Sequence, residues 1–215
     1  MTDVTAGFDT VYADAHLLVL NKPSGLLSVP GKGADKQDCL STRVQQHYPD
    51  ALIVHRLDMA TSGLMLLARG PAMQTALSKL FEARAVHKHY VAVVQGRMLQ
   101  SPDWQLIDLP IALDWPNRPL RIIDANGKPS QTRWRALQYN ADTNTTRVEL
   151  KPITGRSHQL RVHLTALGHP MLGDALYAPC DVKAKSARLL LHACALRFLH
   201  PANAKTMIFE NLALF

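Results

Sequence analysis

Cysteine is scarce in this chain of 215 residues. The 3 cysteines are Cys39, Cys180 and Cys194, and no two of them have the CxxC spacing of a zinc or redox motif. An odd number of widely spaced thiols does not form a disulfide framework, so the sequence favours a reducing compartment. We therefore expect a cytoplasmic protein.

Long apolar runs are also absent. No window approaches the roughly 18 apolar residues that a membrane-spanning helix needs. Residues 1–5 lack the basic and then apolar sequence of a secretion signal. We expect no membrane partner.

The common motifs of cofactor and nucleophile chemistry are missing too. The sequence has no GxGxxG, no P-loop and no GxSxG, which excludes the usual nucleotide cradles and the serine elbow. It has 10 histidines but no HExxH, and His158 and His163 do not have metal-ligand spacing. We therefore expect neither a metal nor a cofactor.

Positive charge, in contrast, is in excess. The formal net charge is +7, and residues 108–215 contain 14 Lys and Arg against 8 Asp and Glu. A basic half favours a polyanionic partner. Nucleic acid is favoured over a membrane surface because no basic amphipathic helix accompanies the charge.

Short strands dominate the predicted secondary structure. Helical spacing occurs in residues 39–48, after a capping Asp38, in residues 72–84, and in a helix that Ser157 caps and Gly168 ends. Apolar or alternating runs predict strands at 17–21, 86–94, 131–139, 146–153, 189–199 and 206–210.

Residues 104–113 have no clear periodicity and are predicted to be an irregular connection. No repeat, low-complexity segment or linker divides the chain. The sequence therefore predicts one α+β domain over residues 1–215, with a mixed, largely antiparallel sheet and flanking helices.

Residues 55–63 (His-Arg-Leu-Asp-Met-Ala-Thr-Ser-Gly) interrupt two strand-like segments, and Asp58 lies at their centre. Because Asp, Thr, Ser and Gly are all turn formers, an ordinary turn is one interpretation. A functional site is the other, because connections on a rigid scaffold often carry chemistry. A carboxylate held charged by a guanidinium can act as nucleophile or base without a cofactor.

Several other side chains also have two interpretations. Lys22 ends the first strand and either reaches a phosphate or is solvated. Lys88 and Tyr90 share a strand face, where a tyrosine is usually core but can also stack on a base. Arg133 and Arg135 share another strand face, and it is either solvated or in contact with phosphates.

Five motifs, in order, resemble the RluA-type pseudouridine synthases. Residues 55–63 are similar to the catalytic motif of that family. The other motifs are Asn-Lys-Pro-Ser-Gly-Leu at 21–26, Lys-His-Tyr at 88–90, residues 154–163 with 168–170 and 173–174, and residues 189–193. Together they cover nearly the whole chain.

The resemblance implies a bisected mixed sheet and the isomerisation of uridine to pseudouridine in RNA, without metal or cofactor. Asp58 would be the catalytic nucleophile, and Tyr90 would stack on the target base and assist proton removal. Arg161, or alternatively Arg156, would pair with Asp58. Arg56 would hold the RNA open around a flipped-out nucleotide, because the glycosidic bond cannot be reached inside a stack.

The further residues that we expect to bind RNA are Lys22, Lys88, Arg118, Arg133, Arg135, Arg156 and His158. Within the family, the short form and the loop at 114–119 are most similar to a dual-specificity member. That member is associated with 23S ribosomal RNA and the anticodon stem-loop of several tRNAs. We expect structured RNA as partner, no obligatory protein partner and a monomer. The alternative is a non-catalytic RNA-binding or chaperone protein on the same fold.

Overall fold

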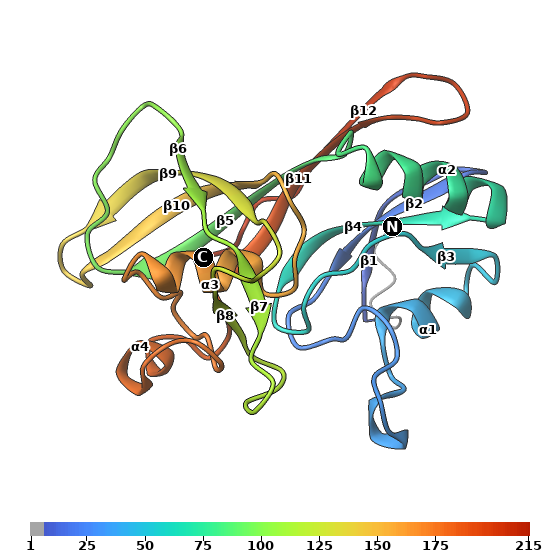
Figure 1. Ribbon diagram of the computed structural model, residues 1–215. Coiled ribbons are helices and arrows are strands. Elements are labelled where there is room, and N and C mark those ends of the chain that lie inside the picture. Colours follow the sequence, from blue (N-terminus) through green and yellow to red (C-terminus); the bar gives the residue numbers. More distant parts are fainter. Residues whose placement is uncertain (1–6) are drawn as a thin grey trace. The chain divides into compact units, whose positions relative to one another are not determined.

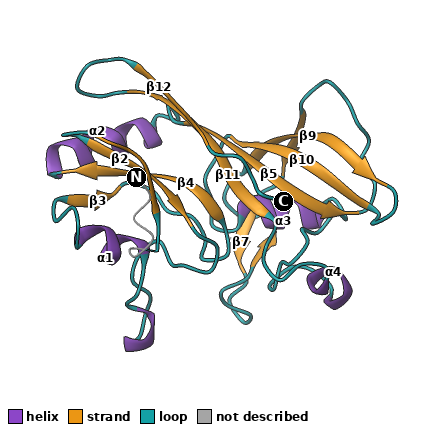
Figure 2. Ribbon diagram, turned by 180° about the vertical axis from the view of Figure 1, so that it is seen from behind, coloured by secondary structure: helices purple, strands orange, loops and turns teal. Residues whose placement is uncertain are grey.

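The computed structural model describes residues 7–215, which form two compact units. Unit 1 contains the described residues up to Lys88 together with His192–Leu214, and unit 2 contains His89–Leu191 together with Phe215. Residues 1–5, where the sequence shows no secretion signal, lie outside the described part. Figures 1 and 2 show strands and a few helices in each unit.

Unit 1 is built on a mixed sheet. Antiparallel pairing joins β1 to β2, β2 to β4, β3 to β4, and β11 to β12, whereas β11 pairs with β4 in parallel. Two helices, α1 and α2, belong to this unit, and α2 begins with Pro71 at its first turn. The strands are β1 (Asp9–Ala13), β2 (Leu17–Lys22), β3 (Ala51–Ile53), β4 (Ser62–Arg69), β11 (Leu191–Leu199) and β12 (Thr206–Glu210), and the helices are α1 (Leu40–Gln45) and α2 (Pro71–Glu82).

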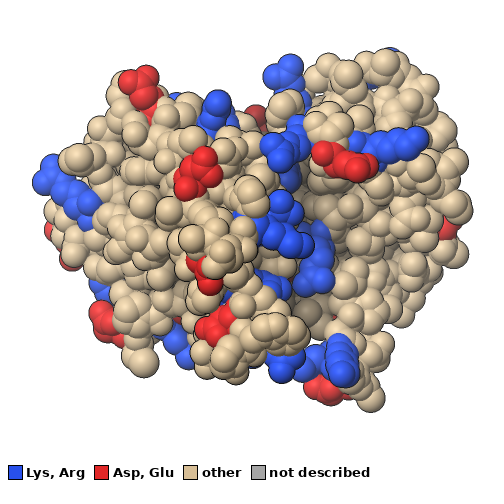
Figure 3. Space-filling model, in the orientation of Figure 1, with Lys and Arg blue, Asp and Glu red and all other residues tan. Residues whose placement is uncertain are grey.

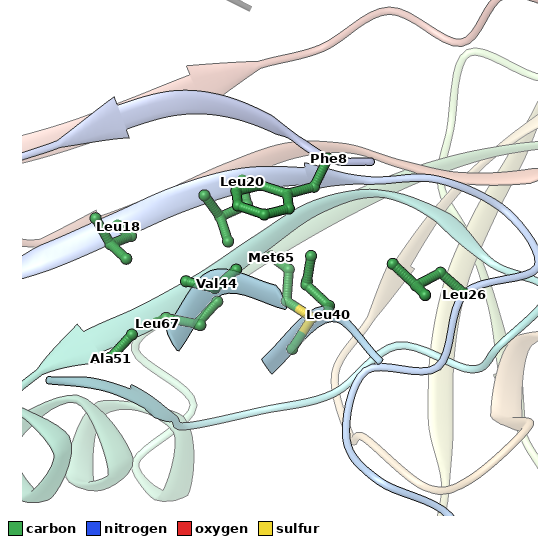
Figure 4. Close-up of a cluster of buried hydrophobic side chains, with 9 residues drawn as sticks. All are labelled: Phe8, Leu18, Leu20, Leu26, Leu40, Val44, Ala51, Met65 and Leu67. Atoms are coloured by element: carbon green, nitrogen blue, oxygen red, sulfur yellow. The ribbon is translucent and has the colours of Figure 1, made fainter. Parts of the chain in front are cut away.

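Both faces of β2 and β4 are buried, which explains their continuous apolar sequences. Successive strand residues point to opposite faces, so each strand contributes to two separate cores. The first core joins the sheet to α1 (Figure 4) and contains Phe8, Leu18, Leu20, Leu26, Leu40, Val44, Ala51, Met65 and Leu67. The second joins it to α2 and contains Leu17, Val19, Leu64, Leu66, Ala68, Leu77, Val86, Leu196 and Phe198.

Unit 2 contains an antiparallel sheet in the order β5-β10-β9-β6 and a separate hairpin of β7 and β8. Helix α3 packs against β8 and β9. The elements are β5 (His87–Gln95), β6 (Gln105–Asp108), β7 (Ile111–Leu113), β8 (Arg121–Ile123), β9 (Gln131–Asn140), β10 (Thr145–Pro152), α3 (Gln159–Ala166) and α4 (Cys180–Ala184).

The α+β class and the mixed, largely antiparallel sheet are confirmed. The irregular connection predicted for residues 104–113 is wrong, because this segment contains β6 and β7. Asp38 does not cap α1. Cys39 is the N-cap residue instead, and Asp38 forms an ion pair with Arg43 at 2.6 Å. In the part of the chain that the structure describes, no helix is long and apolar enough to cross a membrane.

Candidate functional site

The segment that carries Asp58 leaves the sheet between β3 and β4. Strand β3 ends at Ile53, and the imidazole of His55 then takes the place of a main-chain acceptor. Its Nε2 accepts a hydrogen bond from the Leu66 N–H at 2.9 Å, and its ring stacks on Phe81 at 4.6 Å between centroids. Burial lowers the pKa of His55 to about 3, and the positive charge of Lys88 adds to this effect. The neutral ring therefore satisfies the edge of β4 while the main chain departs.

We define residues 55–61 as the Asp58 loop. Three residues that lie in the N-terminal motif (21–26) or just after it hold this loop by hydrogen bonds. Ser28 bonds both main-chain groups of Leu57: its Oγ donates to the carbonyl at 2.7 Å and accepts from the N–H at 3.1 Å. Ser24 Oγ donates to the Ala60 carbonyl at 2.7 Å. The Gly25 N–H donates to the Met59 carbonyl at 2.8 Å. The two motifs that the sequence separates thus form one hydrogen-bonded assembly.

Lys22 is the centre of this assembly, and its side chain is fully buried. Its Nζ donates to the carbonyls of Pro23 at 2.8 Å, Leu26 at 2.7 Å and Met59 at 3.1 Å. Burial lowers the pKa of Lys22 to about 8, while the negative charge of Asp58 acts in the opposite direction. The expected contact of Lys22 with an RNA phosphate disagrees with this burial, because the ammonium does not reach the surface.

The start of β4 is attached to β11. Gly63 has a φ of +113°, and a Cβ there would lie 2.4 Å from the Ala193 carbonyl oxygen, so only glycine fits. Beside it, Ser62 Oγ lies 2.9 Å from His192 Nδ1, and both side chains are buried. His192 Nε2 lies 3.1 Å from the carbonyl oxygen of Asn211, which can only accept a hydrogen bond. The imidazole therefore carries its proton on Nε2 and accepts from Ser62 through Nδ1.

Asp58 itself is partly buried, and its main-chain carbonyl accepts the Thr61 N–H at 3.1 Å. Of the two side chains that precede Asp58, that of Leu57 is buried and that of Arg56 is exposed. Lys88 is partly buried. Its Nζ lies 6.0 Å from the Phe81 ring centroid, and burial lowers its pKa. The Asp58 loop therefore presents Arg56 to solvent, while its main chain is held in place by hydrogen bonds.

In unit 2, Tyr90 is buried on β5 and faces Leu150 of β10 in the strand register. Arg161 is buried on α3 and makes a bidentate pair with Asp174, with Nε to Oδ2 at 2.8 Å and Nη2 to Oδ1 at 2.5 Å. Its guanidinium carbon also lies 5.0 Å from the Tyr177 ring centroid. The pairing of Arg161 with Asp58 stays a prediction.

His158 begins α3 in the left-handed conformation, with a φ of 57°. The predicted cap at Ser157 is wrong, because His158 is the N-cap residue and no side chain caps this end. Tyr177 Oη accepts the Arg121 N–H at 2.9 Å and lies 2.6 Å from His158 Nδ1, within hydrogen-bond distance. Arg156 is exposed, and its Nε donates to the Pro129 carbonyl at 3.4 Å.

The basic side chains of β9 differ in their surroundings. Arg133 is exposed, whereas Arg135 binds Glu149 at 2.7 Å and lies over Trp104 at 4.9 Å from the ring centroid. Lys151 lies over the same ring at 3.9 Å. Figure 3 shows several Lys and Arg side chains at the surface. Exposed positive charge of this kind suits a polyanion.

Sequence reasoning missed some of these roles. Ser24 and Ser28 lie in the N-terminal segment, and Asp174 lies in the motif that begins at residue 154. Nothing in the sequence tells which main-chain group or arginine each one binds. His192 lies in the last motif, and its partner Ser62 lies 130 residues earlier in the chain. Among residues 7–215, no group of three or more His, Cys, Asp and Glu side chains has the arrangement of a metal site.

This fold is that of the RNA pseudouridylate synthases, and residues 16–166 match the family of that name. The chain belongs to it and is an RNA pseudouridine synthase, an enzyme that isomerises uridine in RNA. It is 52% identical over 206 residues to the dual-specificity RNA pseudouridine synthase RluA of Escherichia coli strain K12, covering 95% of this chain and 93% of the relative.

Other relatives agree. The dual-specificity RNA pseudouridine synthase RluA of Vibrio parahaemolyticus is 51% identical over 197 residues, covering 90% of this chain and 78% of the relative. Among solved structures, human RNA pseudouridylate synthase domain containing 1 has a TM-score of 0.78 and 29% identity, covering 95% of this chain and 83% of that one. Human RNA pseudouridylate synthase domain containing 4 has a TM-score of 0.74 and 26% identity, covering 95% and 88%.

Proposed function

We propose that Asp58 is the catalytic nucleophile of this synthase and acts on a flipped-out uridine in structured RNA. The observation that carries the proposal is the construction of the loop. Lys22, Ser24, Gly25 and Ser28 all bind its main chain, which leaves little freedom to the residue it carries. An active-site group has to be held rigidly in its productive geometry, and such a loop meets that need.

The buried Lys22 ammonium also interacts with Asp58, whose negative charge acts to raise the pKa of Lys22. The carboxylate is the form of an aspartate that acts as a nucleophile or base. In the proposed reaction this carboxylate starts the cleavage of the bond between ribose C1′ and uracil N1. The base then turns, C1′ bonds to C5, C5 loses a proton and N1 gains one. The step is an isomerisation and needs no oxidant, reductant or cofactor.

Tyr90 and Arg161 have supporting roles in this proposal. Tyr90 stacks on the target uracil and assists in removing the C5 proton, and Arg161, with Arg156 as the alternative, pairs with Asp58. The bidentate bond to Asp174 orients the Arg161 guanidinium, which a single hydrogen bond would not do. Exposed Arg56 fills the space that the flipped nucleotide leaves in the RNA.

The substrates we propose are stem-loops of 23S ribosomal RNA and of tRNA, in line with the dual specificity of the RluA relatives. We further propose that both units act as one catalytic domain and that the protein is a cytoplasmic monomer with no obligatory protein partner. Lys88, Arg118, Arg133, Arg135, Arg156 and His158 are the side chains we propose to contact RNA.

Replacement of Asp58 by Asn tests the proposal. We expect Asp58→Asn to abolish pseudouridine formation in a tRNA anticodon stem-loop, because the amide is not a nucleophile, while the Kd for the same RNA changes by less than a few fold. Pseudouridine is measured by mass spectrometry of the digested RNA. Turnover by a clean preparation of the variant would refute the role of Asp58.

A further inference from the structure

The loop that joins β7 to β8 carries a largely exposed indole ring. Trp115 is 64% exposed, although burying a tryptophan is among the largest hydrophobic gains available to a chain. The guanidinium carbon of Arg118 lies 4.3 Å from the Trp115 ring centroid. We call this pair the Trp115 platform. A large apolar ring held on the surface and backed by a cation points to a ligand.

The loop is rigid enough to present this ring in one position. Its ends are joined by a hydrogen bond from the Asp114 N–H to the Leu120 carbonyl at 3.1 Å, and the Leu120 N–H bonds the Asn117 carbonyl at 3.0 Å. The Asp114 carboxylate accepts from the Asn117 side-chain amide at 3.0 and 3.2 Å. Binding to such a loop loses little conformational entropy.

The hairpin below the loop is attached to the rest of unit 2. The Arg121 N–H bonds Tyr177 Oη at 2.9 Å, and the Ile111 N–H bonds the Lys128 carbonyl at 3.0 Å. Tyr177 also contacts His158 and Arg161, so this hairpin and α3 share one network. The Trp115 platform therefore has a fixed position relative to Arg161, which we have proposed to serve the reaction.

We infer that the Trp115 platform stacks on an unpaired base of the RNA substrate, outside the target uridine, while Arg118 meets a neighbouring phosphate. The inference rests on the proposed action on stem-loops, because such a ligand must offer bases that are not paired. An indole stacks on any base through its π face, and a guanidinium binds phosphate oxygens. The platform would then favour RNA loops over duplexes without reading their sequence.

The test uses binding, so that it does not depend on turnover. In the full-length Asp58→Asn protein, Kd is measured by fluorescence anisotropy for a tRNA anticodon stem-loop and for a blunt duplex of equal length and charge. Trp115→Ala should weaken stem-loop binding about 5- to 100-fold, the effect of losing one stacked base, and leave duplex binding unchanged. Trp115→Phe should restore most of the affinity. Leu99→Ala, at an apolar residue that is 81% exposed, should change neither.

A second measurement identifies the base. Single abasic nucleotides are placed along the loop, and at the stacked position Trp115→Ala should cost nothing further, since the contact is already lost. An unchanged Kd in Trp115→Ala would overturn the inference, and so would an equal loss for stem-loop and duplex. A wild-type protein that sediments as a dimer and becomes a monomer on Trp115→Ala would show that a second copy covers the ring. Failure of the Asp58 proposal is seen separately, as turnover by Asp58→Asn.

Discussion

The role of Lys22 depends on its burial. The ammonium of Lys22 donates to three main-chain carbonyls, one of which belongs to the Asp58 loop. A lysine that reaches a phosphate has to be exposed, and this one has no exposed surface. Its role is therefore to position the loop.

We expect Lys22→Met to lower kcat at least tenfold and to leave the KM for RNA within about twofold, because the loop loses a donor while the RNA surface does not change. The unfolding free energy should fall by about 1–3 kcal/mol, since buried carbonyls lose their partner. Steady-state kinetics and urea unfolding measure the two effects. A flatter dependence of RNA affinity on salt in the variant would show instead that Lys22 contacts a phosphate.

At the scale of elements, the exit of the chain from β3 depends on one imidazole. His55 accepts the Leu66 N–H only while Nε2 is unprotonated, and the folded protein keeps it so with a pKa of about 3. In the unfolded chain the pKa of a histidine is near its ordinary value of about 6.5. Between these two values the unfolded state binds more protons than the folded state.

His55 should therefore make the protein sensitive to acid. The unfolding free energy rises with pH wherever the unfolded state binds more protons, so this contribution is complete above pH 6.5 and is lost as the pH falls toward 3. The loss approaches about 1.4 kcal/mol per pH unit in that window. His55→Gln keeps an acceptor that does not titrate, so urea unfolding from pH 7 to 4 should show a shallower decline in the variant. Parallel curves for both proteins would contradict the prediction.

The elements also show where sequence reasoning succeeded. The sequence predicted β2 because a strand that is buried on both faces is a continuous apolar run. It predicted β9 because a strand that is buried on one face alternates between apolar and polar residues. β6 and β7 were missed because they have 4 and 3 residues and little buried surface. Helix α4, with 5 residues, is too short for a periodic signal.

The candidate site divides in the same way. Each motif is a short run of consecutive residues, so the sequence alone allowed Asp58, Tyr90 and Arg161 to be proposed as site residues. Their hydrogen bonds are not local, because Lys22 binds the carbonyl of Met59, which lies 37 residues away, and that carbonyl would be the same in any residue type. A main-chain partner leaves no trace in the sequence, and the burial of Lys22 could not be predicted for that reason.

For the whole molecule, the excess of positive charge should be visible as a salt dependence, but its members should not contribute equally. Exposed Arg133 is available to a phosphate, whereas Arg135 is already bound to Glu149 and Trp104. Arg133→Ala should reduce the slope of log K against log salt by about 0.7–0.9, the value of one contact, for every RNA tested. Arg135→Ala should reduce it by less. Filter binding between about 50 and 200 mM salt measures the slopes. Equal slopes for the wild type, Arg133→Ala and Arg135→Ala would show that neither arginine contacts a phosphate.

The parallel pairing of β4 with β11 has a consequence for the synthesis of the protein. Ser62 and Gly63 lie directly after the Asp58 loop, but their partners His192 and Ala193 lie 130 residues later in the chain. A growing chain emerges from its N-terminus, and pairings between distant residues form only after both have appeared. The Asp58 loop therefore cannot take its final form on the ribosome until residues 192 and 193 have been translated, and products truncated before them should be unable to modify RNA.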